Sequence, residues 1–264
     1  MLRMSIERPR TIAIRLIGIT ALSAVGSAGA LAQANVPQFR GDVGLLAGTQ
    51  APRGSYIGVF HNADNANHVI DGSGMSRAVA INSHALALLL EYSSNYQIFG
   101  GRWAAIAAPA WVSAEFALPN IATSPMWGFS DLYVVPLQLG WSSKKADLVF
   151  GQGFFAPTGR FEQGNPHNTG RGMWSYESTL GGTLYAGSKR LTSFSTLASY
   201  QVNSHVKDSD KRPGQTLVLE GGVGQEIPAV KGRAGVVYYA RWKLTDDQGF
   251  PILERFLTRD RYYG

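Results

Sequence analysis

The sequence contains no cysteine, and Asp, Glu, Lys and Arg together make up only 16% of its 264 residues. The absence of thiols excludes disulfides, thiolate metal sites and cysteine nucleophiles. It does not exclude a folded domain, because a chain of this length can bury a large core unaided. The low charge is unusual for a protein whose entire surface faces water.

Long hydrophobic runs are also missing. After residue 34 no stretch reaches the roughly 18 consecutive apolar residues that a transmembrane helix needs. Helical periodicity is hard to find in the same region, whereas apolar and polar residues alternate repeatedly between turn signals. A chain of this kind enters a membrane only as a closed barrel, since only helices and barrels satisfy all backbone polar groups in lipid.

The first 34 residues have a different pattern. Four arginines precede or begin an apolar run at 16–25, and small-x-small cleavage sites end at positions 32 and 34. This is typical of a secretory signal peptide, and the apolar run is shorter than the roughly 20 residues of a membrane anchor. We predict removal of residues 1–34, which leaves one domain at 35–264 with 20 basic and 17 acidic residues. This nearly equal number of basic and acidic residues does not indicate nucleic-acid binding.

Turn signals separate about ten predicted strands. They lie at 55–62, 83–92, 97–116, 131–142, 147–156, 173–186, 192–205, 215–227, 233–245 and 253–263. Pro109 and Pro136 fall inside two of these strands and imply a bulge or break in each, because proline cannot donate to a ladder. The connections 62–82, 117–130 and 157–172 contain Asn, Gly, Pro and His, as extracellular loops do. The expected fold is an all-β, antiparallel barrel.

The polar faces of the last two hairpins supply candidate permeation residues. If polar faces stay together, Glu177 lies opposite Gln201, and Glu220 lies opposite Arg241. These faces are rich in Ser, Thr, Asn and Gln, which suits a narrow polar lumen better than open water. The residues predicted to line the lumen are Glu177, Gln201, Asn203, His205, Glu220, Arg241 and Lys243. They either select permeants or form a structural network that rigidifies the lumen, and the sequence leaves both alternatives open.

Aromatic residues mark the ends of several predicted strands. Tyr133 and Trp141 close the stretch YVVPLQLGW, and an extended strand separates them by roughly 26 Å. Tilted, this length approaches the apolar band of about 25 Å, flanked by aromatic girdles, of outer-membrane barrels. The predicted girdle consists of Tyr133, Trp141, Trp174, Tyr176, Tyr238 and Trp242. Candidate ring contacts for a permeant are Trp103, Trp111, Phe155 and Trp174.

A series of motifs resembles one known family. The motifs are GFSDLYVVPLQLGW (128–141), FAPTGRF (155–161), NTGRGMWS (168–175), SYQVN (199–203), PG (213–214) and DDQG (246–249). In this order they resemble the outer-membrane proteins of the phenol meta-pathway degradation family, over most of 43–264. The resemblance implies an outer-membrane β-barrel of a Gram-negative bacterium that passes hydrophobic or aromatic compounds. The family pattern continues past Gly264, so we expect a barrel of twelve strands from which about two are missing.

No catalytic or cofactor site is predicted. The five histidines are dispersed without metal-ligand spacing, and Ser199, Asn203 and His205 lie on one strand, where they cannot converge as a triad. The favoured function is a channel without catalysis, in contact with outer-membrane lipid, lipopolysaccharide and small hydrophobic or aromatic solutes. The alternatives are a non-conducting structural or lipid-handling barrel and a secreted soluble β carrier. The sequence does not identify the permeant or the oligomeric state.

Overall fold

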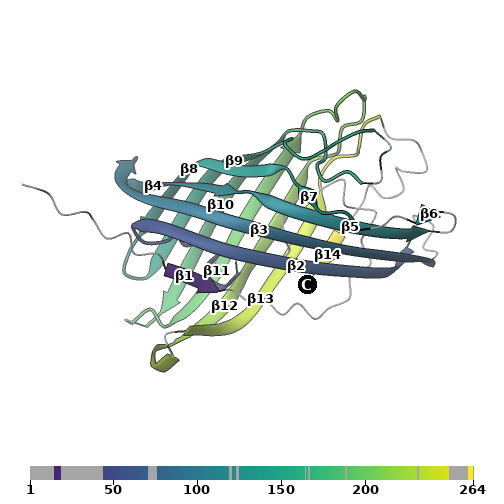
Figure 1. The fold of residues 1–264 in the computed structure, drawn as a ribbon. Helices are drawn as coiled ribbons and strands as arrows, with labels where there is room; N and C mark the ends of the chain where they lie inside the picture. Colours follow the sequence, from purple (N-terminus) through teal and green to yellow (C-terminus); the bar gives the residue numbers. More distant parts are fainter. Residues whose placement is uncertain are drawn as a thin grey trace, which may run out of the picture.

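The protein forms one curled β-sheet in the computed structural model (Figure 1). The structure describes residues 15–18, 44–70, 76–118, 121–122, 125–163, 165, 167–187, 189–230, 232–249 and 261–263. Its strands are β1 (Arg15–Gly18), β2 (Gly54–Ile70), β3 (Ser76–Ile98), β4 (Gly101–Ala108), β5 (Ala110–Leu118), β6 (Ile121–Ala122), β7 (Gly128–Phe129), β8 (Leu132–Ser142), β9 (Ala146–Ala156), β10 (Ser175–Ala186), β11 (Thr192–Asn203), β12 (Thr216–Ile227), β13 (Gly232–Lys243) and β14 (Arg261–Tyr263). Two short 3-10 turns, η2 (Gly44–Leu46) and η3 (Pro228–Val230), complete the elements.

The strands follow one another around the sheet as a meander. The hydrogen-bonded order is β1-β2-β3-β4-β8-β9-β10-β11-β12-β13-β14, with β5 beside β3 and the short β6 and β7 beside β5. All pairs are antiparallel except that of β1 with β2. β1 lies within the predicted signal peptide. The all-β, antiparallel prediction is confirmed, and the sheet curls into at least a half-barrel. The predicted last strand at 253–263 lies outside the described residues except at β14.

The two proline breaks predicted from the sequence are present. Pro109 separates β4 from β5, and the long strand β3 pairs with both. The carbonyl of Pro109 still accepts a hydrogen bond from the Leu88 amide at 3.0 Å. At Pro136, the β8–β9 register shifts between Val134 and Leu137. Proline therefore interrupts the ladder at both positions without ending the sheet.

The bulge at Pro136 changes which side chains of β8 face inward. Tyr133 pairs with Phe155 before the bulge, whereas Trp141 pairs with Leu148 after it. Phe155 is buried and Leu148 is exposed. Tyr133 and Trp141, the two rings of the stretch YVVPLQLGW, therefore lie on opposite faces of the sheet. The prediction that Tyr133 belongs to an outer aromatic girdle is wrong, because the bulge inserts one residue and inverts the alternation.

Strands β2 and β3 are longer than predicted. The region 62–82 was expected to be a loop, but β2 continues to Ile70 and β3 begins at Ser76. Their pairing continues past Asn65 with one irregularity between Ala66 and His68. The strands persist there although the simple alternation of apolar and polar residues does not.

The two ends of the sheet have different connections. At one end, here called the short-turn end, residues 99–100, 143–145, 187–191 and 228–231 link neighbouring strands. At the other, the long-loop end, the connections include 157–174 and 204–215. Outer-membrane barrels have this asymmetry, with short turns on the periplasmic side and longer loops outside.

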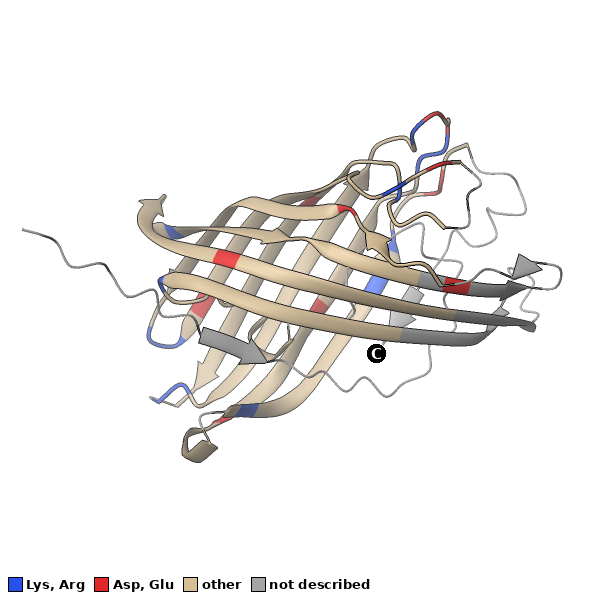
Figure 2. Cartoon of the chain, in the orientation of Figure 1, with Lys and Arg blue, Asp and Glu red and all other residues tan. Residues whose placement is uncertain are grey.

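The inner and outer faces have opposite polarity. On β10 and β11 the inward Ser175, Thr183 and Ser193 have no exposed surface, whereas the outward Leu184 and Phe194 are 63% and 50% exposed. A water-soluble sandwich has the reverse distribution, with apolar residues buried. Charged residues on these strands are few (Figure 2). In the part of the chain that the structure describes, no helix has the length and apolarity to cross a membrane.

The bulge at Pro136 gives a test of the inner and outer faces. Because the chain has no native cysteine, single Tyr133→Cys and Leu137→Cys variants each carry one spin label in bilayers. Both positions are odd-numbered, but the bulge places Tyr133 inside and Leu137 outside. We expect oxygen, which concentrates in hydrocarbon, to relax the label at 137 strongly and the label at 133 weakly. Equal oxygen accessibility at both positions would contradict the inverted alternation.

Candidate functional site

An extended segment, residues 44–53, lies across the inner face near the short-turn end. It contacts β13, β12 and β11 through η2, and the Gly48 amide donates to Ser195 Oγ on β11 at 2.8 Å. Further along, Ser93 on β3 donates to the Ala51 carbonyl at 3.2 Å. The segment therefore reaches strands on both sides of the sheet, and we call it the inner segment.

Glycines on the inner wall make room for the inner segment. A Cβ added at Gly140 would lie 2.6 Å from Gln50 Oε1. On the other wall, a Cβ at Gly235 would lie 2.8 Å from the Leu45 side chain. The inner segment needs its own glycine as well, because a Cβ at Gly48 would lie 2.2 Å from the Gly182 backbone. The glycine content of these strands thus serves a close approach of two backbone segments.

Asp147 is the centre of a hydrogen-bond network that holds the inner segment. Its Oδ2 accepts hydrogen bonds from the Tyr185 hydroxyl at 2.7 Å and from Thr49 at 3.2 Å. The same oxygen forms an ion pair with Arg190 at 2.5 Å. Oδ1 accepts a bond from Ser142 at 2.6 Å. The side chain of Asp147 is only 4% exposed, so this buried carboxylate depends on the partners that surround it.

A second anchor fixes the other half of the inner segment. Arg102 on β4 donates from Nε to Gln50 Oε1 at 3.0 Å and from Nη2 to the Ala51 carbonyl at 2.8 Å. Gln50 returns a hydrogen bond from Nε2 to the Arg102 carbonyl at 3.0 Å. Gln50 is buried. These reciprocal bonds hold the segment to β4, which only β8 separates from the strand that carries Asp147.

A second polar cluster lies inside, toward the long-loop end. Tyr133 donates its hydroxyl to Glu177 Oε1 at 2.6 Å, and its ring stacks on Phe155 with centroids 4.4 Å apart. The guanidinium of Arg171 lies 5.4 Å from the Phe155 ring centroid and 3.4 Å from Asp131. Polar groups and aromatic rings therefore alternate around one part of the inner surface.

The guanidinium of Arg171 is deeply buried in this cluster. Burial lowers its pKa, and the attraction of Asp131 and Glu177 opposes that effect. Nη2 donates to Ser175 Oγ at 2.9 Å, while Nη1 has no hydrogen-bond partner among the described residues. A buried donor without a partner is costly, and an oxygen atom of a molecule inside the sheet would satisfy it only after the side chains that cover it move.

The first predicted register is confirmed. Glu177 lies opposite Gln201, and both are buried on the inner face. Asn203 Oδ1 accepts hydrogen bonds from Gln201 Nε2 at 3.0 Å and from Ser175 Oγ at 2.6 Å. His205 is not brought together with them, because β11 ends at Asn203 and the exposed His205 belongs to the following connection.

The second predicted register is wrong by two residues. Glu220 pairs with Tyr239, and Arg241 pairs with Val218. The cause is a tighter connection than expected, since η3 lets Ile227 pair with Gly232. A shift of two preserves the side-chain faces. Both Glu220 and Arg241 accordingly remain buried on the inner face, as diagonal neighbours.

Lys243 lies at the long-loop end of β13. Its Nζ forms an ion pair with Asp247 Oδ2 at 2.5 Å, and the Lys243 side chain is 1% exposed. Asp247 Oδ1 also accepts the Gly214 amide at 2.6 Å. This predicted lumen residue therefore closes a loop as well as facing inward.

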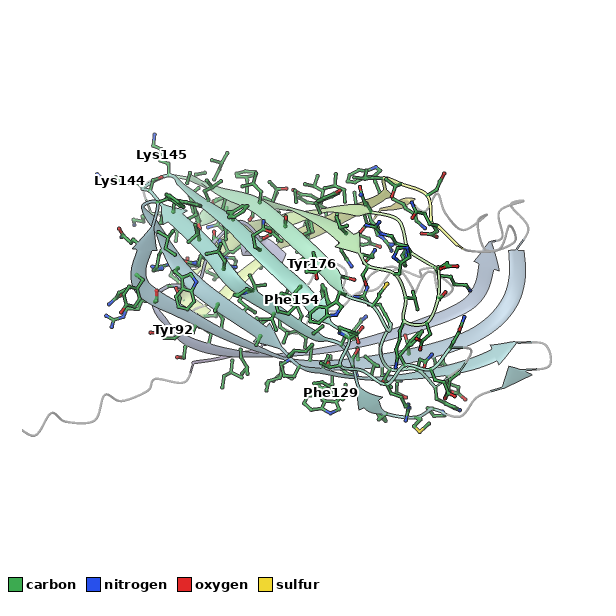
Figure 3. The ribbon with its side chains drawn as sticks, turned by 90° about the horizontal axis from the view of Figure 1, so that it is seen from above. Tyr92, Phe129, Lys144, Lys145, Phe154 and Tyr176 are labelled. Atoms are coloured by element: carbon green, nitrogen blue, oxygen red, sulfur yellow. The ribbon has the colours of Figure 1, made fainter. Side chains whose placement is uncertain are left out.

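Most rings predicted for the girdle or for permeant contact lie on the outer face. Trp174 stacks with Tyr176, and Phe154 lies beside Trp174 with ring centroids 5.7 Å apart. Figure 3 labels Phe154 and Tyr176 on neighbouring strands. The outward side chains of the predicted girdle are Trp141, Trp174, Tyr176, Tyr238 and Trp242. Of the candidate permeant contacts, Trp111 is 40% exposed on the outer face, Trp103 pairs there with Leu139, and only Phe155 is inside.

The sequence prediction missed the inner segment and its anchors. Residues 44–53 have no strand pattern, and Asp147, Arg102 and Arg171 are isolated charges at strand ends or in a connection. A signal was present in the inward glycines, because their positions mark where the wall is cleared. Within the described ranges, no three His, Cys, Asp or Glu residues form a group able to hold a metal ion.

Comparison with known proteins shows a similar fold and the family of the chain. The fold is similar to that of an outer membrane channel from Pseudomonas putida F1, known from its crystal structure, with a TM-score of 0.57. The two share 14% identity, and the alignment covers 76% of each chain. The chain belongs to the family described as "Putative MetA-pathway of phenol degradation", whose model matches residues 61–263. No curated protein matches the sequence.

Replacing the carboxylate at the centre of the Asp147 network tests its structural weight. Asp147→Ala leaves Tyr185, Arg190 and Thr49 without their shared acceptor, so we expect a loss of about 2 kcal/mol in the free energy of unfolding. Urea titration of the refolded protein in detergent measures this loss. The exposed loop residue Asp246 supplies the control, and Asp246→Ala is expected to change stability little. Equal stability of the two variants would show that the network does not hold the fold.

Proposed function

We propose that the protein is an outer-membrane channel that gives small hydrophobic or aromatic compounds passage across the outer membrane, without catalysis. The proposal places the short-turn end in the periplasm, where a chain exported by the predicted signal peptide arrives. Family membership and the fold shared with an outer membrane channel support it. The apolar outer face and the polar inner face suit a wall between lipid and a bore.

The observation that carries the proposal is the pairing of rings and polar groups inside. Tyr133 and Phe155 present stacked rings on the inner surface, with Arg171 and Glu177 beside them. In this proposal an aromatic permeant stacks on such rings, and a hydroxyl or carbonyl on it accepts a hydrogen bond from Nη1 of Arg171 once the side chains that bury this atom move. In this proposal Gln201, Asn203, Glu220, Arg241 and Lys243 line the remainder of the bore.

The inner segment favours a second candidate, a non-conducting structural barrel. Residues 44–53 cross the inner face and are bound to β9 and β4 through Asp147 and Arg102, and to β11 through Ser195. A permanently fixed segment of this kind narrows the bore and rigidifies the wall. The secreted soluble carrier is disfavoured by the exposed apolar side chains of the outer face, among them Leu180, Leu184 and Val236.

Dye entry into whole cells distinguishes the channel from the structural barrel. A hydrophobic fluorescent naphthylamine crosses phospholipid readily but is retarded by lipopolysaccharide, so intact Gram-negative cells provide the barrier. We expect cells that express the full chain to take up the dye several-fold faster than cells that express a similar amount of an unrelated barrel. Equal uptake rates at equal surface amounts would contradict transport.

Locking the inner segment tests whether it must move. Thr49 Oγ1 lies 2.8 Å from Thr183 Oγ1, so Thr49→Cys together with Thr183→Cys gives a disulfide that attaches the segment to β10. We expect oxidised protein to pass the dye more slowly than the same protein after reduction. The control is the Thr49→Cys single variant, which oxidation should not affect. If the oxidised and reduced double variants conduct alike, the segment is not a gate.

A further inference from the structure

A groove with a volume of about 690 Å³ crosses the outer face of the sheet near the short-turn end. One cross-strand row explains it. From β9 to β13 the outward residues of this row are Leu148, Gly182, Thr196, Gly221 and Tyr238. Three small residues in succession lie between two large ones, so the wall is thin in the middle of the row and thick at its ends.

The neighbouring row closes one side of the groove. From β10 to β13 it consists of Leu184, Phe194, Val223 and Val236, all of them large and exposed. On the side of β8, Trp141 adds an indole ring to the lining. The groove is therefore apolar along its length and opens away from the inner face.

Backbone geometry keeps the floor of the groove small. A Cβ added at Gly221 would lie 2.0 Å from the Ser195 carbonyl oxygen and 2.8 Å from the Tyr238 hydroxyl. No side chain can therefore project from Gly221, which lies in the same cross-strand row as Gly182 and Thr196. Gly182 is different, since a Cβ there would meet only the Asp147 carbonyl oxygen at 3.5 Å. The groove at Gly182 is thus open space that a larger side chain can enter.

Basic residues lie at the short-turn end of the groove. Ser143 and Ala146 line it, and the exposed Lys144 and Lys145 lie between them. Figure 3 shows both lysines projecting from the end of the sheet. Lys189, in the next turn, is also exposed.

The acidic groups closest to these lysines along the strands are already paired. Asp147 is neutralised by Arg190, and Glu226 forms an ion pair with Arg233. The lysines therefore give this end of the groove an excess of positive charge, next to the exposed apolar side chains of Leu148 and Leu184.

We propose that this groove binds one anionic phospholipid, with an acyl chain over Gly182 and Thr196 and the phosphate beside Lys144 and Lys145. The proposal rests on the membrane location proposed above, but it is independent of transport. Charge selects the occupant, because a second copy of this chain would bring the same lysines and repel them. A groove of this size is in the range of small-molecule sites, and basic residues at a membrane surface attract anionic lipid headgroups.

The test is competition between two lipids for the refolded full chain. Native mass spectrometry of the protein in neutral detergent, with equal amounts of phosphatidylglycerol and phosphatidylcholine, should show one retained phosphatidylglycerol per chain. Filling the groove by Thr196→Phe or Gly182→Leu should reduce the retention of phosphatidylglycerol about tenfold. This is the effect expected when roughly two methylenes of the acyl chain no longer fit in the groove. Ala198→Phe places the same ring two residues along β11, outside the groove lining, and should leave retention unchanged.

The headgroup is tested separately. Lys144→Gln with Lys145→Gln should lower the preference for phosphatidylglycerol over phosphatidylcholine by about fivefold for each lysine removed. Arg53 and Lys207 are exposed cations away from the groove, and the Arg53→Gln, Lys207→Gln variant should keep the preference. Faster migration on gels before heating checks that every variant is folded. If both groove variants retain phosphatidylglycerol as the native chain does, or if the native chain shows no preference, the proposed site is wrong whatever the outcome of dye uptake.

Discussion

The alternation of side chains between two faces is the constraint on which this structure depends. On β10 and β11 most inward residues are polar, such as Ser175, Thr183 and Ser193, and the largest outward residues are apolar or aromatic, such as Leu184 and Phe194. A single-residue slip would turn hydroxyls toward lipid and leucines toward the bore. On β8 the alternation inverts at Pro136, and this brings Tyr133 inside to Glu177. The same alternation thus determines both the membrane-facing surface and the chemistry of the interior.

The glycines connect the wall to what lies on each side of it. Inside, Gly140 and Gly235 clear the path of the inner segment. Outside, Gly182 lines a groove beside a basic turn, and Gly221 lies in the same cross-strand row. Since Gly182 also lies against Gly48 of the inner segment, one thin region of wall carries the segment on one face and the groove on the other. The inner segment and the groove therefore lie on opposite sides of the same strand, β10.

The sequence predicted the features that depend on local pattern. Alternation predicted the strand faces on β10 to β13 and the pairing of Glu177 with Gln201. The missing N–H of proline predicted the breaks at Pro109 and Pro136. Features set by distant contacts were not predictable in this way. The register of Glu220 depended on how tightly the turn closes, and the inner segment is defined by partners on remote strands, which no local pattern records.

Partition between water and lipid tests the central claim most directly. The account predicts that the refolded chain, after detergent removal, floats with phospholipid vesicles in a density gradient and resists extraction by alkaline carbonate. This is expected because the exposed apolar face of the sheet is unfavourable in water and is removed from water by the lipid. Recovery of the chain as a compact monomer in the aqueous fraction, without detergent or lipid, would contradict the account.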